Sequence, residues 1–505
     1  MFYEESGTVM TSISAAHDRN HGRHSHRRHQ SRRPSLWRRA FGELPGNLIA
    51  IGILWLTLLL FGGSSRGDVI QLTLLRPIAI LVAGFGFWTL RWHHVVKHRF
   101  LVIMAAAITL LAGSHLIPLP PSMWMSLPGR QLIVDVDQSL GLGNVWRPIT
   151  MAPAFGWNAL FSLGIPLAVL VNGIQLTRED LTRIGPALIA GGIASAFLAF
   201  FQLFGTPNGI LYPYSIRLQG PEAVGFFANR NHQALLIAAM FPLLAAYAAR
   251  QGVSVRLDKR RFIVALVLGA FLIPLLIVTG SRAGLAVGIV GLISTPFIFM
   301  RGARVRRSDK SLSMWWKLLA GATAVLAIGG LSIATNRSIA IQRSLASLTE
   351  DDQRYESWAD IAANYERFMP IGSGVGSYQP VFQTFERRGA LTSSYSNHAH
   401  SDWIEVIMTT GIPGAALLMI AIMAFIWAAW GRFRAKDRGT VSAYSLAGLV
   451  IILMIGAASL VDYPVRAPII SAVLVLACLW AETGGRANAA GGRTGRTPEL
   501  TEGVE

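Results

Sequence analysis

The sequence predicts an all-α integral membrane protein with about twelve transmembrane helices. Hydrophobic residues make up 52 % of the 505 residues and charged residues only 14 %, and the mean hydropathy is +0.45. The apolar residues fall in runs close to the ~20 residues that a helix needs to cross a hydrocarbon core of ~30 Å. No run shows the alternation that is typical of a membrane barrel, so the sequence favours helices.

The apolar runs divide the chain into a membrane domain at 46–482 and two polar ends. Residues 1–45 are rich in Arg and His and predict a disordered cytoplasmic arm held near anionic lipid, while 483–505 predict a disordered cytoplasmic tail. The predicted spans are residues 47–63, 70–90, 101–118, 156–174, 186–205, 233–249, 262–279, 283–300, 316–334, 412–430, 443–461 and 467–481.

The positions of Lys and Arg predict the orientation, because these residues favour cytoplasmic loops. With both termini in the cytoplasm, every second loop is basic, and the opposite loops contain no lysine. The basic loops carry Arg91, Lys97 and Arg99; Arg178 and Arg183; Arg250, Arg256, Lys259, Arg260 and Arg261; Arg301, Arg304, Arg306, Arg307, Lys310 and Lys317; and Arg432, Arg434, Lys436 and Arg438.

The net charge of +18 is compatible with a nucleic acid or an anionic membrane surface as partner. The apolar runs decide for membrane lipids and against nucleic acid. The outer face then has three long segments, at 119–155, 206–232 and 335–402. The last is the longest, lies between the ninth and tenth spans, and contains enough aromatic residues to fold over the helices. Long loops of this kind are typically functional or disordered.

Ionisable residues are almost absent from the middle of the predicted spans. A coupled transporter is expected to bury such residues near the midplane. The sequence therefore places any chemistry at the outer interface. A transporter or flippase remains the alternative, and a non-catalytic partner of an assembly complex is a further one.

Two arginines are predicted at the outer ends of helices. Asn229 or Asn231 can cap the helix that follows 225–232, and Arg230 beside that N-terminus makes an anion site. The alternative is that the asparagines only cap and that Arg230 only reaches the interface. Arg282 lies in a tight hairpin at 279–284, where its planar guanidinium suits phosphate oxygens. Arg217 is a third candidate, or a solvated residue.

The 397–414 stretch gathers two histidines and two carboxylates where the longest loop meets an apolar run. Asp402 and Glu405 resemble a capping box, with Ser401 as the competing N-cap, and Gly411 is the expected end of a short helix at 402–410. His400 at the start of that helix is the candidate general base. His398 is expected to support it. The alternative is two ordinary loop histidines.

Two further features allow two interpretations each. The glycine cluster at 372–376 is either a phosphate-binding nest or a plain turn. Asp462 and Arg466, in the turn at 460–466, either have functional roles or pair with each other.

These motifs together resemble the O-antigen ligase and polysaccharide polymerase family of bacterial inner-membrane proteins. His400-Ser401, nine residues and then Gly411-Ile412-Pro413-Gly414 is similar to the family's histidine signature. The run at 226–232 and Ser281-Arg282 resemble its other two landmarks, and the turn at 460–466 looks like that of members tied to exopolysaccharide systems.

The resemblance implies a GT-C-like helical bundle in which 46–482 form a glycan-transfer domain. It implies a metal-independent, inverting glycosyltransferase without a cofactor, working at the periplasmic face. The donor would be a glycan on undecaprenyl diphosphate, and the acceptor a lipid A core, another glycan or a protein hydroxyl. His400 would accept the proton of the acceptor. The substrate site would comprise Arg217, Arg230, Arg282, Asn229, Asn231, His232 and His398.

Overall fold

A computed structural model describes residues 44–206, 209–214, 222–250, 255–303, 361–387 and 397–485. The chain divides into two units, Met1–Leu44 and Pro45–Glu505, and the elements below all belong to the second. The basic arm at 1–45 and the tail at 483–505, both predicted to be disordered, lie almost wholly outside the described residues.

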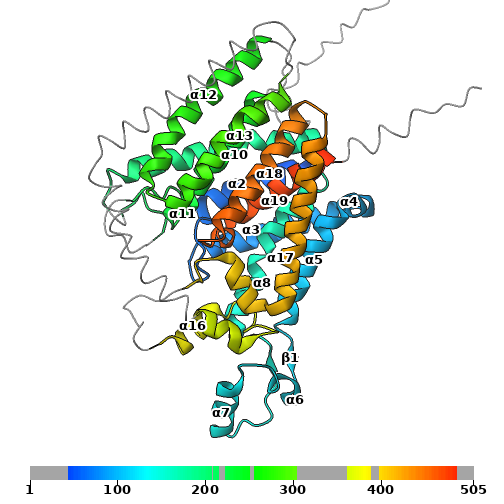
Figure 1. Ribbon diagram of the computed structural model, residues 1–505, viewed down its shortest axis with the longest axis vertical. Helices are drawn as coiled ribbons and strands as arrows, with labels where there is room; N and C mark the ends of the chain where they lie inside the picture. Colours follow the sequence, from blue (N-terminus) through cyan, green and yellow to red (C-terminus); the bar gives the residue numbers. More distant parts are fainter. Residues whose placement is uncertain are drawn as a thin grey trace, which may run out of the picture. The chain divides into compact units, whose positions relative to one another are not determined.

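The described part of the second unit is mainly helical (Figure 1). Its longer helices are α2 (Gly46–Phe61), α3 (Leu72–Thr89), α5 (Arg99–Ser114), α8 (Pro153–Ser162), α9 (Gly164–Gly173), α10 (Arg178–Gln202), α11 (Arg230–Ala248), α12 (Val255–Val278), α13 (Arg282–Gly302), α17 (Asp402–Arg434), α18 (Thr440–Ala458) and α19 (Pro468–Gly485). The shorter elements are α4 (Trp92–Lys97), α6 (Pro121–Trp124), α7 (Gln131–Ser139), α16 (Tyr378–Phe385), η2 (Pro464–Arg466) and the strands β1 (Pro118–Leu119) and β2 (Arg147–Pro148), which pair antiparallel.

Eight helical stretches in the described residues are long and apolar enough to cross a membrane. They are Leu72–Thr89, Pro153–Gly173, Arg178–Gln202, Arg230–Ala248, Arg256–Val278, Arg282–Gly302, Asp402–Arg434 and Thr440–Ala458. Three shorter apolar helices, Gly46–Phe61, Arg99–Ser114 and Pro468–Glu482, coincide with further predicted spans. The predicted span at 316–334 lies outside the described residues. The helical membrane fold is thus confirmed, and the count of twelve spans stays a prediction.

Helices α11 and α13 run parallel and pack through small residues. A Cβ added at Gly284 would overlap the Cβ of Ala234, and one added at Gly302 would press on Ala249. Small residues let helix backbones approach closely in a membrane. Gly302 also faces Ala443, and Gly291 faces Met454, so α18 runs antiparallel to α13. The starts of α11 and α13 and the end of α18 therefore lie at the same end of the bundle.

The close packing of α11 against α13 gives a stability prediction. We expect Gly284→Ala to lower the free energy of unfolding by about 1–3 kcal/mol, because the new methyl meets another Cβ and the helices must separate. The matched control is Gly269→Ala in α12, where nothing lies within 4 Å of the added Cβ. That variant should be as stable as the parent or slightly more stable, because alanine favours helix. Equal losses in thermal unfolding of the two variants would contradict the packing argument.

Helix α17 is interrupted near its start. Gly411 has φ +62° and ψ −150°, which is not helical. A Cβ at Gly411 would overlap the carbonyl oxygen of Pro370, and that same oxygen accepts a hydrogen bond from the Ile412 amide at 2.9 Å. The left-handed φ and the close approach both require glycine here. The predicted short helix at 402–410 with its stop at Gly411 is therefore confirmed.

The glycine cluster at 372–376 is a packed turn. The amides of Gly372, Ser373 and Gly374 donate to the carbonyl oxygens of Phe368, Met408 and Thr409, at 2.8, 3.1 and 2.8 Å. These amides are committed to protein acceptors, so they do not form a phosphate nest. Of the two interpretations, the plain turn is the correct one.

The described part of the long loop packs against the first turns of α17. Phe368, Tyr378 and Phe382 are buried, and the last two form a small core with Ile361 and Met408. The described aromatic residues of the loop thus pack over the start of α17, as the sequence predicts, and their small core includes Ala399, the residue before His400.

Candidate functional site

Ser401 caps the start of α17, with its hydroxyl accepting from the Ile404 amide at 3.4 Å. The capping box expected from Asp402 and Glu405 is wrong. Glu405 instead accepts from the amide of Ala399 at 3.0 Å, and Asp402 accepts from the Ser459 hydroxyl and the Val465 amide, each at 3.1 Å. Both carboxylates therefore accept hydrogen bonds from groups outside the first turn of α17, which a local sequence motif does not predict.

The start of α17 is also fastened to the end of α18 and the turn that follows it. The Trp403 indole donates to the carbonyl oxygen of Gly456 at 3.1 Å. The Ser401 hydroxyl donates to the carbonyl oxygen of Ser459 at 3.1 Å, and the Asp402 amide donates to that of Asp462 at 3.2 Å. The 397–403 stretch is therefore tied to the 456–466 segment.

Three histidines surround one tyrosine in this region. The rings of His232, His398 and His400 lie with centroids 5.6, 4.5 and 5.5 Å from that of Tyr463. We call these four residues the histidine cluster. They come from the start of α11, the segment before α17 and the turn after α18. The structure thus brings together two motifs that are 166 positions apart (398 − 232) in the sequence.

The three histidines differ in exposure. His232 is only 1 % exposed and His398 is half-buried, whereas His400 is exposed. His400 also has a φ of +51°, in the left-handed region that side chains other than glycine rarely adopt. Of the three, His400 is the most exposed.

A charged network lies beside the cluster. Arg466 places Nη2 3.1 Å from Oε1 of Glu405 and Nε 3.4 Å from Oδ1 of Asp402. Glu405 also contacts Nδ1 of His398 at 3.1 Å. Asp462 lies beside His232, with 3.8 Å between Oδ2 and Nε2. Of the two interpretations of this turn, the pairing of Asp462 with Arg466 is not the one observed, because Arg466 contacts Glu405 and Asp402 and Asp462 lies beside His232.

Arg230 and Arg282 occupy the first positions of two neighbouring parallel helices. Asn229 caps α11 by accepting from the Asn231 amide at 2.8 Å, which confirms one of the two predicted caps. Arg230 is half-buried, with Nη1 3.7 Å from Oε1 of Glu222. Arg282 is exposed and begins α13, which Ser281 caps. Arg217 lies outside the described residues.

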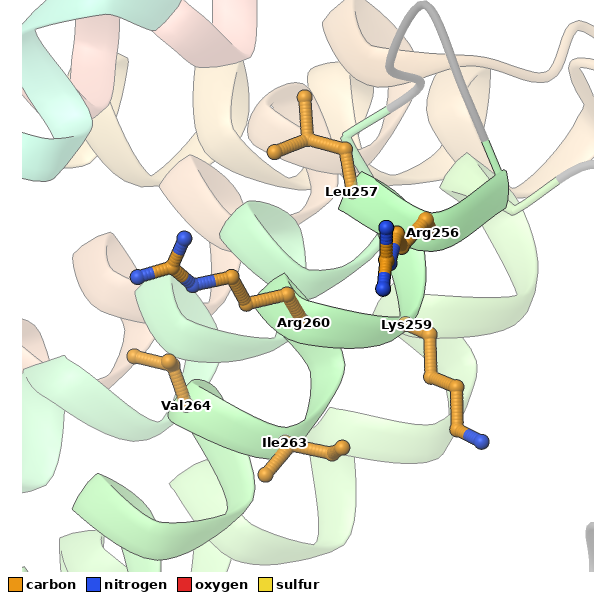
Figure 2. A pocket seen from close by; sticks show the side chains of 6 residues that line it. All are labelled: Arg256, Leu257, Lys259, Arg260, Ile263 and Val264. Carbon is orange, nitrogen blue, oxygen red and sulfur yellow. The ribbon is translucent and has the colours of Figure 1, made fainter.

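One hollow lies away from these residues, near the start of α12 (Figure 2). It is lined by Arg256, Leu257, Lys259, Arg260, Ile263 and Val264. The 24 residues of α12 span roughly 36 Å, and Arg282 follows its other end. The hollow therefore contains none of the predicted site residues. Within the described ranges, no group of three or more His, Cys, Asp or Glu side chains is placed to hold a metal ion.

The fold and the site define a class of protein: a multi-pass helical membrane protein whose polar residues gather where several helices begin or end. Residues 264–419 match the family model described as O-antigen ligase. The matched range includes Arg282, His398, His400 and the kink at Gly411. The match confirms the family resemblance seen in the sequence and supports a membrane glycosyltransferase of the ligase or polymerase type. A comparison with curated proteins finds no match.

Proposed function

We propose that the protein transfers a glycan from undecaprenyl diphosphate to an acceptor hydroxyl at the periplasmic face of the bacterial inner membrane. The observation that carries the proposal is the exposed His400 at the start of α17, clustered with His232 of α11. Helix α11 also carries Arg230, and its parallel neighbour α13 begins at Arg282. A candidate base, His400, and two cations, Arg230 and Arg282, thus lie at the same end of the bundle.

In the proposed step, His400 acts as general base. As the acceptor oxygen forms its bond to the anomeric carbon, the acceptor proton passes to the imidazole of His400. The bond from that carbon to the diphosphate oxygen breaks, and its electron pair leaves with the diphosphate. Attack opposite the leaving group inverts the anomeric centre. The reaction needs no metal in this proposal, because the arginines neutralise the leaving charge.

The two arginines suit a diphosphate for electrostatic reasons. One close charge pair is worth about 4 kcal/mol at an effective dielectric near 20, before desolvation costs. The aligned N-termini of α11 and α13 add partial positive charge at the same level. Glu222 lies 3.7 Å from Arg230 and partly balances its charge. In this proposal, Asn229 caps α11 and accepts from the amide of Asn231. His232 belongs to the histidine cluster, and His398 supports His400.

The alternative of a transporter is less well supported. The charged pairs around His400 lie at helix ends and in the 459–466 turn. The core of the described spans is mainly apolar, and the polar side chains buried in it, such as Asn172, Ser195 and Ser445, are uncharged. A hydrated, charged path through the bundle would favour transport instead.

The proposal can be tested in a deletion strain by mass analysis of lipid-linked intermediates and surface glycans. Loss of the protein should cause undecaprenyl-linked glycan to accumulate. Accumulated polymer would identify a ligase, and accumulated single repeats a polymerase. An unchanged pool of lipid-linked glycan and an unchanged surface would contradict both.

A further inference from the structure

The backbone at His400 is held in a conformation that costs energy. Its φ of +51° lies in the left-handed region, and such residues persist only where the surroundings fix them. Both neighbours are buried, with Ala399 4 % and Ser401 1 % exposed, while His400 itself is exposed. The chain therefore turns outward at this one residue, and the contacts of its neighbours set where the imidazole lies.

On the N-terminal side, the contacts converge on Glu405. One oxygen of this carboxylate accepts from the Ala399 amide at 3.0 Å and lies 3.1 Å from Nδ1 of His398. On the C-terminal side, they converge on Asp402. Its amide donates to the Asp462 carbonyl oxygen, and its side chain accepts from the Val465 amide.

Arg466 joins the two sides. Its guanidinium contacts Glu405 at 3.1 Å and Asp402 at 3.4 Å. Both carboxylates are buried, with 2 % and 8 % of the residue exposed. Two buried carboxylates of like charge require a cation nearby, and the planar fork of arginine can serve both at once. Among the described residues, Arg466 is the cation in ion-pair contact with both.

We infer that Arg466 is a positioning residue for His400. It holds Glu405 and Asp402 together, and these carboxylates hold the 398–402 turn in the conformation that presents the imidazole to the acceptor. Arg466 does not touch the substrate in this account. The inference rests on the proposed function, because it assigns Arg466 a role through His400.

The experiment compares Arg466→Gln with the parent in a vesicle glycan-transfer assay. We expect kcat to fall about 10- to 100-fold with KM within about twofold, because a small displacement of a catalytic group costs that much. Arg466→Lys should recover part of the loss, since it restores the charge without the fork. Glu405→Gln, which removes one charge only, should lower kcat in the same way, and it serves if Arg466→Gln does not fold.

Arg432→Gln is the matched control. Arg432 is another buried arginine, 3 % exposed, that pairs with Asp437 at the far end of α17. Its loss should lower thermal stability and leave kcat unchanged. The inference is overturned if Arg466→Gln and Glu405→Gln retain the parent kcat, or if Arg432→Gln loses as much. His400→Ala distinguishes failure of the proposed function from failure of the role given to Arg466. If His400→Ala is fully active, the proposed function is wrong. If His400→Ala is inactive while Arg466→Gln and Glu405→Gln keep the parent kcat, only the role of Arg466 is wrong.

Discussion

Replacement of His400 by alanine is expected to lower glycan transfer by about 10²–10⁴-fold, the contribution typical of a general base. The side chain is exposed and is not part of the buried core, so the variant should be expressed and inserted as the parent is. Transfer is measured in membrane vesicles by the appearance of elongated or ligated glycan at equal protein levels.

The comparison for His400→Ala is His398→Ala. The ring of His398 contacts Glu405, so His398→Ala should affect transfer only by shifting His400. Its loss of activity should therefore be smaller than that of His400→Ala. Full activity of His400→Ala, or a larger loss in His398→Ala than in His400→Ala, would contradict the assignment of the base.

Arg282→Ala is expected to give the second large effect, a loss of at least about tenfold in kcat/KM for the lipid-linked donor. A tenfold loss corresponds to about 1.4 kcal/mol, well within the value of one close charge pair. Arg282→Lys keeps the charge but not the bidentate geometry. Its loss of kcat/KM should become smaller as the salt concentration is lowered, because the remaining charge attraction is then less screened. Initial rates over a range of donor concentrations provide the measurement.

A matched control for Arg282 lies near the other end of α12. Arg256 is also an exposed arginine near a helix start, but it lines the hollow of Figure 2. Arg256→Ala should leave donor kinetics unchanged. Equal effects of the two substitutions would show that general surface charge, and not a diphosphate contact, is responsible.

The parts of the fold that depend on local sequence could be predicted. Apolar runs locate helices because a membrane span must satisfy its own backbone hydrogen bonds. The cap at Asn229 and the stop at Gly411 follow from residue types at fixed positions. The predicted orientation puts the 226–232 and 397–403 motifs on the same face, but their meeting around Tyr463 is seen only in the structure.

The partners of the charged residues could not be predicted in the same way. Asp402 and Glu405 look like a local cap, but Arg466 and Val465, about 60 positions later, determine what they do. Tyr463, the centre of the histidine cluster, had no sequence signal beyond its place between Asp462 and Arg466. These contacts depend on how α17 docks on the end of α18, and that docking is set by packing and not by sequence periodicity.

The central claim is that the chain itself transfers glycan from a lipid diphosphate. The most direct measurement uses the purified full-length protein in proteoliposomes with an undecaprenyl-diphosphate-linked glycan and a glycan or lipid A core acceptor. The account predicts that each transferred glycan releases one undecaprenyl diphosphate, and that His400→Ala lowers the rates of both by about 10²–10⁴-fold. Release without transfer, transfer without release, or equal rates in parent and His400→Ala would contradict it.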